Sequence, residues 1–245
     1  MIVFPMAGLS QRFSEAGYSP PKYMLEAGGK SLFRHAVEGF SYYFGNLPFL
    51  FVLRDVQDSL GFVREECAKL GLDRPLITVL SEPTRGQAET VMLGLEDQSV
   101  GADDPLSIFN IDTFRPGFRF PKMAEEPWVD GYLEVFRGSG ANWSYVGPAE
   151  DDPGRVAKTA EKNEISDLCC TGLYHFAKAG FFTDAFRQAA LPASTDEFYI
   201  APLYNFLIGA GSHIRFDLIG RGEVIFCGVP EEYEMFREKC GDGRV

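Results

Sequence analysis

Strand-like and helix-like segments alternate through residues 1–112 of this chain. Short apolar runs, typical of strands buried on both faces, occur at 2–4, 49–53, 76–80 and 106–111. Apolar residues recur between them at helical spacing in 32–40, 56–70 and 88–95, and Gly71 ends the second helix. This alternation predicts a parallel β-sheet with crossover helices.

The pattern changes after Asp112. Strands are expected at 132–136, 143–146, 156–159 and 172–176, helices at 181–189, 199–208 and from Glu231, and a last strand pair at 214–218 and 224–227. No repeat or linker interrupts the chain. We therefore expect one α/β domain over residues 1–245, with a Rossmann-like, mixed but mostly parallel sheet flanked by helices and with halves at 1–112 and 113–245.

Charge and composition exclude several function classes. The 23 basic and 35 acidic residues give a net charge of −12, which disfavours binding to nucleic acid or an anionic membrane. No apolar run approaches the roughly 20 residues of a membrane helix, and no basic leader precedes the first strand. The five cysteines have neither disulfide nor zinc-site spacing. We expect a cytoplasmic protein with reduced thiols.

The loop after the first strand has features of a phosphate-binding segment. Ala7, Gly8 and Ser10 are small enough to let the backbone approach an anion, and Arg12 adds a planar cation. Ten residues later, two prolines stiffen the backbone just before Lys22. A structural turn with two solvated cations explains the same residues, and the pattern alone leaves both interpretations open.

A carboxylate follows the fourth strand. In an open α/β sheet, ligands bind at the carboxyl ends of the strands, and Asp112 ends the run 107–111. Two other nucleotide motifs are absent: Met24 stands where a P-loop before Gly29-Lys30-Ser31 needs glycine, and no G-x-G-x-x-G follows the first strand. A lone aspartate at the position of Asp112 could also cap a helix or a turn.

These residues together resemble a known family. Residues 6–13 followed by 21–25 are similar to the signature of the sugar-1-phosphate nucleotidyltransferases, or NDP-sugar pyrophosphorylases. Further segments resemble the family in the same order at 84–88, 110–112, 161–162, 171–174, 197–200 and 228–233. The resemblance runs almost end to end and is nearest to enzymes that supply capsule or surface-polysaccharide precursors.

The resemblance implies a nucleotidyltransferase fold and a reaction. A nucleoside triphosphate would bind the first half and a phosphorylated, sugar-like acceptor the second, with release of pyrophosphate. Arg12 would hold the β- and γ-phosphates and Lys22 the α-phosphate, while Ala7, Gly8, Leu9 and Ser10 cradle the chain of phosphates. Asp112 would bind Mg²⁺, a hard cation that prefers carboxylate and phosphate oxygens.

The resemblance also implies residues that contact the base and the acceptor. Glu82, Gly86 and Gln87 would hold the base or ribose, with free N–H groups at the start of a helix. Lys162 would bind the acceptor's phosphate, Glu161 and Glu197 its hydroxyls, and Gly172 would allow close approach. Glu82 could equally be a solvated acid, and Glu197 an acid at a helix start. Glu161 and Lys162, adjacent on an expected strand, would point to opposite faces.

Two positions depart from the family pattern. Ser10 stands where many members have glycine, and Phe226 stands where many have a second metal-binding aspartate. Either one carboxylate suffices, or Asp217 or Glu223 substitutes, or the chain is a non-catalytic binding homologue. A glycosyltransferase is a further alternative, although Asn110 replaces the first aspartate of a D-x-D motif. The base, the acceptor and a homo-oligomeric state are left open.

Overall fold

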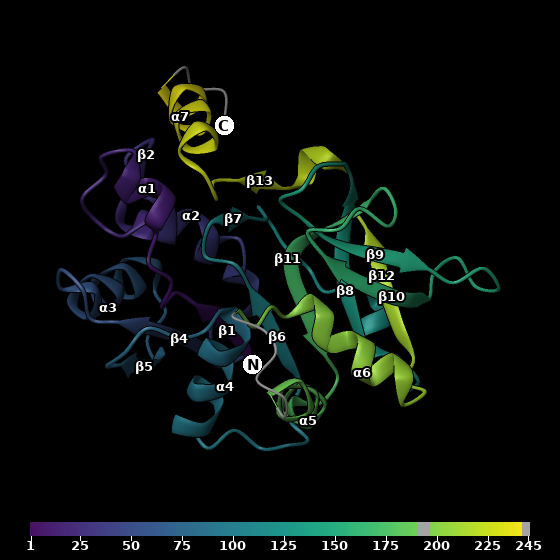
Figure 1. The fold of residues 1–245 in the computed structure, drawn as a ribbon. Coiled ribbons are helices and arrows are strands. Elements are labelled where there is room, and N and C mark those ends of the chain that lie inside the picture. The colour runs from purple at the N-terminus through teal and green to yellow at the C-terminus, as the bar shows by residue number, and fades with distance from the viewer. Residues whose placement is uncertain (191–196, 242–245) are drawn as a thin grey trace.

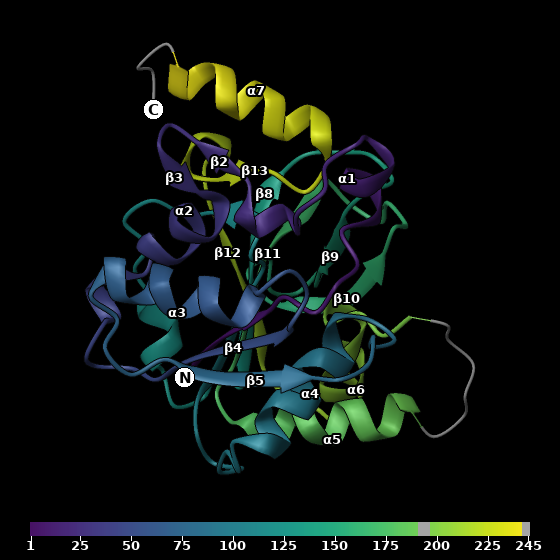
Figure 2. The ribbon, with the colours of Figure 1, turned by 90° about the vertical axis from the view of Figure 1, so that its left-hand side faces the viewer.

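The computed structural model describes residues 1–190 and 197–241. A nine-stranded mixed sheet runs through both halves of the chain and carries helices on both faces (Figures 1 and 2), as the alternation of segments predicts. Its main path has the order β10-β9-β11-β6-β1-β4-β5, and β8 joins it by pairing with β11. Among the described residues, no helix is long and apolar enough to cross a membrane.

The first half forms the parallel part of the sheet. Its strands are β1 (Ile2–Pro5), β4 (Phe49–Arg54), β5 (Leu76–Leu80) and β6 (Leu106–Phe109), and its main helices are α2 (Leu32–Glu38), α3 (Ser59–Leu70) and α4 (Gln87–Asp97). β1 lies between β4 and β6, parallel to both. The carboxyl ends of β1 and β6 therefore open at the same edge.

The second half is mainly antiparallel. Its strands are β8 (Gly131–Arg137), β9 (Ser144–Pro148), β10 (Val156–Glu161), β11 (Leu168–Phe176) and β12 (Ile214–Leu218), and its helices are α5 (Ala179–Ala190) and α6 (Tyr204–Gly209). β11 is the link, because it pairs with β6 of the first half and with β8 and β9. A register shift interrupts β11 between Cys170 and Tyr174.

Short elements surround the main sheet. They are α1 (Gln11–Glu15), the two-residue strands β2 (Glu26–Ala27), β3 (Lys30–Ser31), β7 (Thr113–Phe114) and β13 (Ile225–Phe226), the helix α7 (Pro230–Gly241), and one-turn 3₁₀ helices at Lys22–Met24, Ser41–Tyr43, Lys122–Glu125, Ala201–Leu203 and Arg221–Glu223. α7 lies next to β2, far along the chain from it.

Two expectations about the second half were wrong in detail. The last two strands do not pair with each other, since β12 lies parallel to β8 and β13 pairs with β7. The helix expected at 199–208 is shorter: a 3₁₀ turn begins at Ala201 and α6 only at Tyr204. Pro202, which has no N–H to donate, stands inside the expected helix and explains its later start.

Alternating side chains of the strands divide the core between the two faces of the sheet. Val3 and Ile108 pack with α4, α5 and α6 on one face, and Phe4 and Phe109 pack with α2 and α3 on the other. All four side chains are fully buried. Successive side chains of each strand point to opposite faces, and both faces are covered by helices. This packing holds the strand ends in place.

Candidate active site

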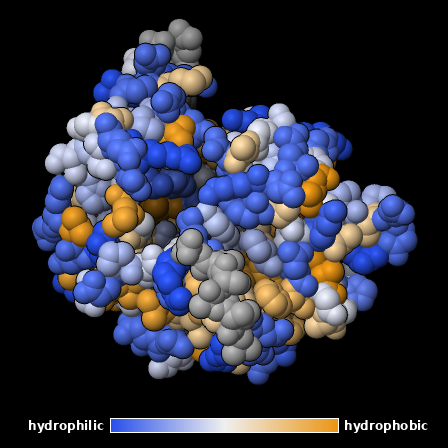
Figure 3. Space-filling view, viewed as in Figure 1, coloured by the Kyte–Doolittle hydropathy of each residue, from blue (hydrophilic) through white to orange (hydrophobic). Residues whose placement is uncertain are grey.

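Two adjacent cavities open at the carboxyl ends of the parallel strands. The larger has a volume of about 690 Å³ and the smaller about 560 Å³. Residues of the second half line much of the larger cavity, whereas among the described residues of that half only Glu197 lines the smaller one. Both are lined by Ser10, Gln11, Lys22, Gln87, Asn110, Asp112 and Glu197. Hydrophilic side chains predominate around the hollow in this face (Figure 3).

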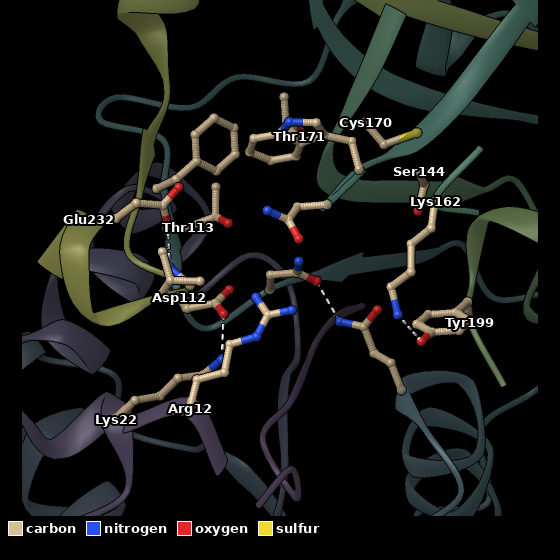
Figure 4. A pocket seen from close by; sticks show the side chains of 18 of the residues that line it. Arg12, Lys22, Asp112, Thr113, Ser144, Lys162, Cys170, Thr171, Tyr199 and Glu232 are labelled. Carbon is tan, nitrogen blue, oxygen red and sulfur yellow. Dashed lines mark hydrogen bonds and ion pairs between the residues drawn. The ribbon is translucent and has the colours of Figure 1, made fainter. Parts of the chain in front are cut away.

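The ammonium group of Lys22 meets the carboxylate of Asp112 where the cavities join. Lys22 begins a 3₁₀ turn after Pro21, and Asp112 lies just beyond β6. Lys22 Nζ donates a hydrogen bond to Asp112 Oδ2 across 90 residues of sequence (Figure 4). Their side chains are 24% and 16% exposed, so the pair is only partly shielded from solvent. A ligand's phosphates can therefore reach the ammonium from the cavity.

The loop between β1 and α1 lies beside this pair. Ala7, Gly8 and Leu9 line the smaller cavity, and Ser10 lines both. Ser10 has a left-handed backbone with φ of 51°, a conformation that favours glycine, and its Oγ accepts a hydrogen bond of 3.3 Å from the Lys22 N–H. The serine at this departure from the family pattern thus ties the loop to Lys22.

Arg12 lies on the side of the larger cavity. Its guanidinium points toward the region of Asp112 and Lys22 (Figure 4), and it does not line the smaller cavity. Among residues 1–190 and 197–241, no side chain forms an ion pair with it. Its charge is therefore available to an anion in this cavity.

The start of α4 differs from the sequence-based expectation. Gly86 and Gln87 line the smaller cavity, but the Ala88 N–H donates to Phe198 O at 3.0 Å, and Gln87 Nε2 donates to Asn110 Oδ1. The Ala88 N–H is therefore not free for a base or ribose, whereas Gln87 keeps a second amide hydrogen and its Oε1, so its contact with the nucleotide stays a prediction. A Cβ at Gly86 would lie 2.6 Å from Phe198 O, so the close approach of this segment requires glycine.

Glu82 stays outside both cavities. Its side chain is exposed, whereas the next residues, Pro83 and Thr84, line the smaller cavity. The structure therefore does not bring Glu82 to the nucleotide side. Its position is that of a solvated acid, the second of the two interpretations of the sequence.

Glu161 and Lys162 face the same cavity, contrary to the expectation of opposite faces. β10 ends at Glu161, and Lys162 leaves the strand with a left-handed φ of 54°, which turns its side chain. The hydroxyl of Ser144 donates to Glu161, and Lys162 Nζ donates to the hydroxyl of Tyr199. Burial raises the pKa of Glu161, against the opposing effects of Ser144 and Lys162.

Glu197 is not at a helix start. It lies in an irregular segment before the 3₁₀ turn at Ala201–Leu203, and the Tyr199 hydroxyl donates to its carboxylate. Lys162 Nζ lies 4.0 Å from Glu197 Oε2. Figure 4 shows Lys162 beside Tyr199. Tyr199, which the sequence interpretation did not single out, therefore joins the cation to the carboxylate on this side of the cavity.

Gly172 has a different neighbour from the one expected. It lines the larger cavity with φ of 100°, and a Cβ there would lie 2.4 Å from Asn110 Nδ2. The position of a Cβ is therefore filled by the Asn110 amide, and the close approach of an acceptor to this glycine stays a prediction.

Phe226 contributes to an aromatic wall. It pairs with Thr113, the residue that follows Asp112, where β13 lies antiparallel to β7. Its ring centroid lies 4.6 Å from that of Trp143 and 5.1 Å from that of Phe136, and both Phe226 and Trp143 line the larger cavity. The position of the expected second aspartate is thus an apolar surface.

Another carboxylate comes close to Asp112. Neither Asp217 nor Glu223 lines either cavity, but Glu232, in the first turn of α7, lines the larger one. The Gly228 N–H donates to Glu232 Oε2 at 2.8 Å. A Cβ at Gly228 would lie 3.4 Å from Asp112 Oδ2 and 3.7 Å from Glu232 Oε2, so both carboxylates approach the same point. An acid soon after Gly228-Val229-Pro230 is the only sequence signal for it.

Known proteins similar to this chain were found among solved structures. A scan of protein-family models and a search of curated proteins gave no match. Among solved structures, a nucleoside-diphosphate-sugar pyrophosphorylase from Vibrio cholerae RC9 is 52% identical, with a TM-score of 0.92 over 97% of this chain and all of that one.

More distant structures share the fold. An inositol-1-phosphate CTP transferase from T. maritima is 15% identical, with a TM-score of 0.73 over all of this chain and 96% of that one. A UDP-glucose pyrophosphorylase complexed with UDP-glucose is 16% identical, with a TM-score of 0.77 over 99% of this chain and 98% of that one. The end-to-end match at 52% identity shows that this chain belongs to the nucleoside-diphosphate-sugar pyrophosphorylases, which are nucleotidyltransferases.

Proposed function

We propose that this enzyme joins a nucleoside triphosphate, bound in the smaller cavity with its β- and γ-phosphates extending past the junction to Arg12, to a sugar-1-phosphate bound in the larger cavity. The observation that carries the proposal is the Lys22–Asp112 pair where the two cavities meet. Nucleotidyl transfer needs this layout, because two polyanions must be aligned at one point of concentrated positive charge.

The reaction forms one bond and breaks another. An oxygen of the acceptor's phosphate attacks the α-phosphorus, the new P–O bond forms, and the bond from that phosphorus to the bridging oxygen breaks, releasing pyrophosphate. Lys22 offers its ammonium to the α-phosphate oxygens. Arg12 balances the charge that develops on the leaving pyrophosphate, and the loop 7–10 faces the phosphates with its backbone.

The acceptor is held by the opposite side of the larger cavity. Lys162 binds its phosphate, while Glu161 and Glu197 accept hydrogen bonds from hydroxyl groups, as carboxylates can only accept. The aromatic wall of Trp143 and Phe226 offers an apolar surface to the carbon-bound hydrogens of a sugar ring. This combination of one cation, carboxylates and aromatic rings supports a phosphorylated sugar as the acceptor.

Mg²⁺ fits the residues at the junction. No group of three or more His, Cys, Asp or Glu side chains in the described residues could hold a metal ion alone. Asp112 and Glu232 nevertheless present two carboxylates near Gly228, and Mg²⁺ commonly uses one or two carboxylates together with substrate phosphates. Asp112 would hold the ion with Glu232 as the second acid, and bound Mg²⁺ would neutralise charge on the phosphates.

Its place in metabolism is proposed from the chemistry of its substrates. Nucleoside triphosphates are cytoplasmic metabolites, so we expect the reaction to occur in the cytoplasm. Its product would be consumed by glycosyl transfer into a polysaccharide. The division of labour between residues 1–112 and 113–245, and any homo-oligomer, belong to the same proposal.

A screen of substrate pairs tests the proposed function. Pyrophosphate release is measured for each common triphosphate with a panel of sugar-1-phosphates, with and without Mg²⁺, alongside thermal shifts. One pair is expected to give magnesium-dependent release. Stabilisation by a triphosphate without release from any pair would instead identify a non-catalytic binding protein.

A further inference from the structure

Asn110 lies where the two cavities meet but has no assigned role in the reaction. It follows the last residue of β6 and precedes Asp112 by two positions. Its side chain is half-buried and lines both cavities. A polar group at this junction can contact the groups between which the nucleotidyl unit moves.

The contacts of Asn110 set the direction of its amide. Gln87 Nε2, from the start of α4, donates to Asn110 Oδ1. Nδ2 is turned toward Gly172, since a Cβ there would lie 2.4 Å from it. Gly172 lines only the larger cavity, so the N–H₂ group faces the acceptor side.

The backbone of Asn110 is also fixed. Its N–H donates to Gly172 O at 3.3 Å, and its carbonyl oxygen accepts from the Thr113 N–H at 3.4 Å. No side chain or backbone carbonyl among the described residues accepts a hydrogen bond from Nδ2, whereas Oδ1 is engaged. A donor held in place without a protein acceptor is suited to an oxygen of a ligand.

We propose that Asn110 Nδ2 donates a hydrogen bond to a phosphate oxygen of the acceptor, positioning that phosphate for attack on the α-phosphorus; this inference rests on the proposed function. The amide is neutral, so it adds a donor beside Asp112 without competing for the ammonium of Lys22. Gly172 is glycine because any side chain there would push this amide aside.

Binding and kinetics of Asn110→Asp test the proposal. This change keeps an oxygen for Gln87 and nearly the same shape, but it replaces the donor with a negative charge. Binding of two probes, inorganic phosphate and glucose-1-phosphate, is measured by calorimetry without triphosphate, and kcat and KM are measured with the best substrate pair. Asn46→Asp is the matched control, since Asn46 is exposed and lines neither cavity.

The expected result separates the two asparagines. Asn110→Asp should weaken at least one phosphate probe about 100-fold and Asn110→Ala about 10-fold, whereas the control should change binding less than about 3-fold. Triphosphate affinity should change less than about 3-fold in all three. Should Asn110→Asp fail to fold, Asn110→Ser, which keeps a shorter donor, should bind the probe more tightly than Asn110→Ala.

Other results would overturn the role of Asn110. Probe binding and acceptor kcat/KM at wild-type levels in Asn110→Asp would do so, as would a wild-type protein that binds neither probe. Failure of pyrophosphate release from every substrate pair would overturn the proposed function instead, and probe binding by the wild-type protein and Asn110→Asp would still decide the inference.

Discussion

The two sides of the active site are built in different ways. The nucleotide side is formed mainly by the loop 6–11, the start of α4 and residues 110–112, which follow β1, β5 and β6 in turn. The acceptor side gathers residues 142–144, 161–162, 170–172, 197–199 and 226–232, which come from segments far apart in the chain. One side is a row of strand ends, and the other is assembled by the tertiary fold.

Their supports also differ. Behind the nucleotide side stand fully buried apolar strands such as β1 and β6. Behind the acceptor side, a buried ion pair joins Arg115 Nε to Glu134 Oε2 at 2.9 Å, and the Thr171 hydroxyl donates to Glu134 Oε1 at 2.8 Å. Thr171 precedes Gly172, so polar contacts help to hold the acceptor side. An ion pair depends on both of its partners, because removal of one leaves a buried charge unpaired.

Removal of Arg115 should have the largest effect on stability. Arg115→Met leaves Glu134, whose side chain is 1% exposed, without its cation, and should lower the free energy of unfolding by about 3–5 kcal/mol. Urea denaturation measures this change. The double variant Arg115→Met/Glu134→Leu should recover most of the loss. If Arg115→Met alone were as stable as the wild type, the ion pair would not support the acceptor side.

Loss of Lys22 should have the largest effect on turnover. Lys22→Ala removes a fixed charge at the transferred phosphate and should lower kcat about 100- to 1,000-fold. Binding of the triphosphate should weaken less than about 10-fold, because other groups also contact the phosphates. Steady-state kinetics and calorimetry separate the two quantities. Lys30→Ala, which breaks only the surface pair with Glu38, is the control and should be neutral; unchanged turnover in Lys22→Ala would remove Lys22 from the mechanism.

Lys162→Ala should affect only the acceptor side. The KM for the sugar-1-phosphate should rise about 10- to 100-fold, since a charged hydrogen bond to phosphate is lost, while the KM for the triphosphate stays constant. Lys158→Ala, on the exposed part of β10, is the matched control and should not change either KM. An equal rise in both KM values would mean that the two sides are not independent.

Acid pH should give the smallest effect. Because burial raises the pKa of Glu161, its carboxyl group takes up a proton at a higher pH than an exposed glutamate does. As the pH falls through this raised pKa, Glu161 loses the negative charge with which it binds a hydroxyl group of the acceptor. The KM for the acceptor should then rise about threefold more than the KM for the triphosphate. Glu161→Gln should remove this excess. A variant that kept the full pH dependence would assign it to the substrate's own phosphate.

The nucleotide side was largely predictable from local pattern. Strands buried on both faces appear as continuous apolar runs, and their ends locate the loop 7–10 and Asp112. Lys22 could be singled out because two prolines precede it. The proximity of Lys22 and Asp112 needed the fold, since 90 residues separate them.

The acceptor side was predictable only through the family resemblance, and only in part. Glu161 and Lys162 were placed on opposite faces because a strand was assumed to continue, but the left-handed backbone at Lys162 turns both into one cavity. Tyr199 gave no local signal, and Glu232 gave only its place soon after Gly228-Val229-Pro230, since a surface acid or tyrosine has the same sequence environment.

The sequence by itself determined the order of strands and helices, the phosphate loop and the ends of the parallel strands. The reason is that apolar strand patterns and helical spacing extend over only a few neighbouring residues. Only the tertiary structure decided that Phe198 covers the start of α4, that Asn110 fills the space at Gly172 and that Glu232 approaches Asp112. The residues that meet here are far apart in the sequence: Asn110 and Gly172 are separated by 62 positions, and Asp112 and Glu232 by 120. They depend on how the two halves pack, which no local pattern of residues encodes.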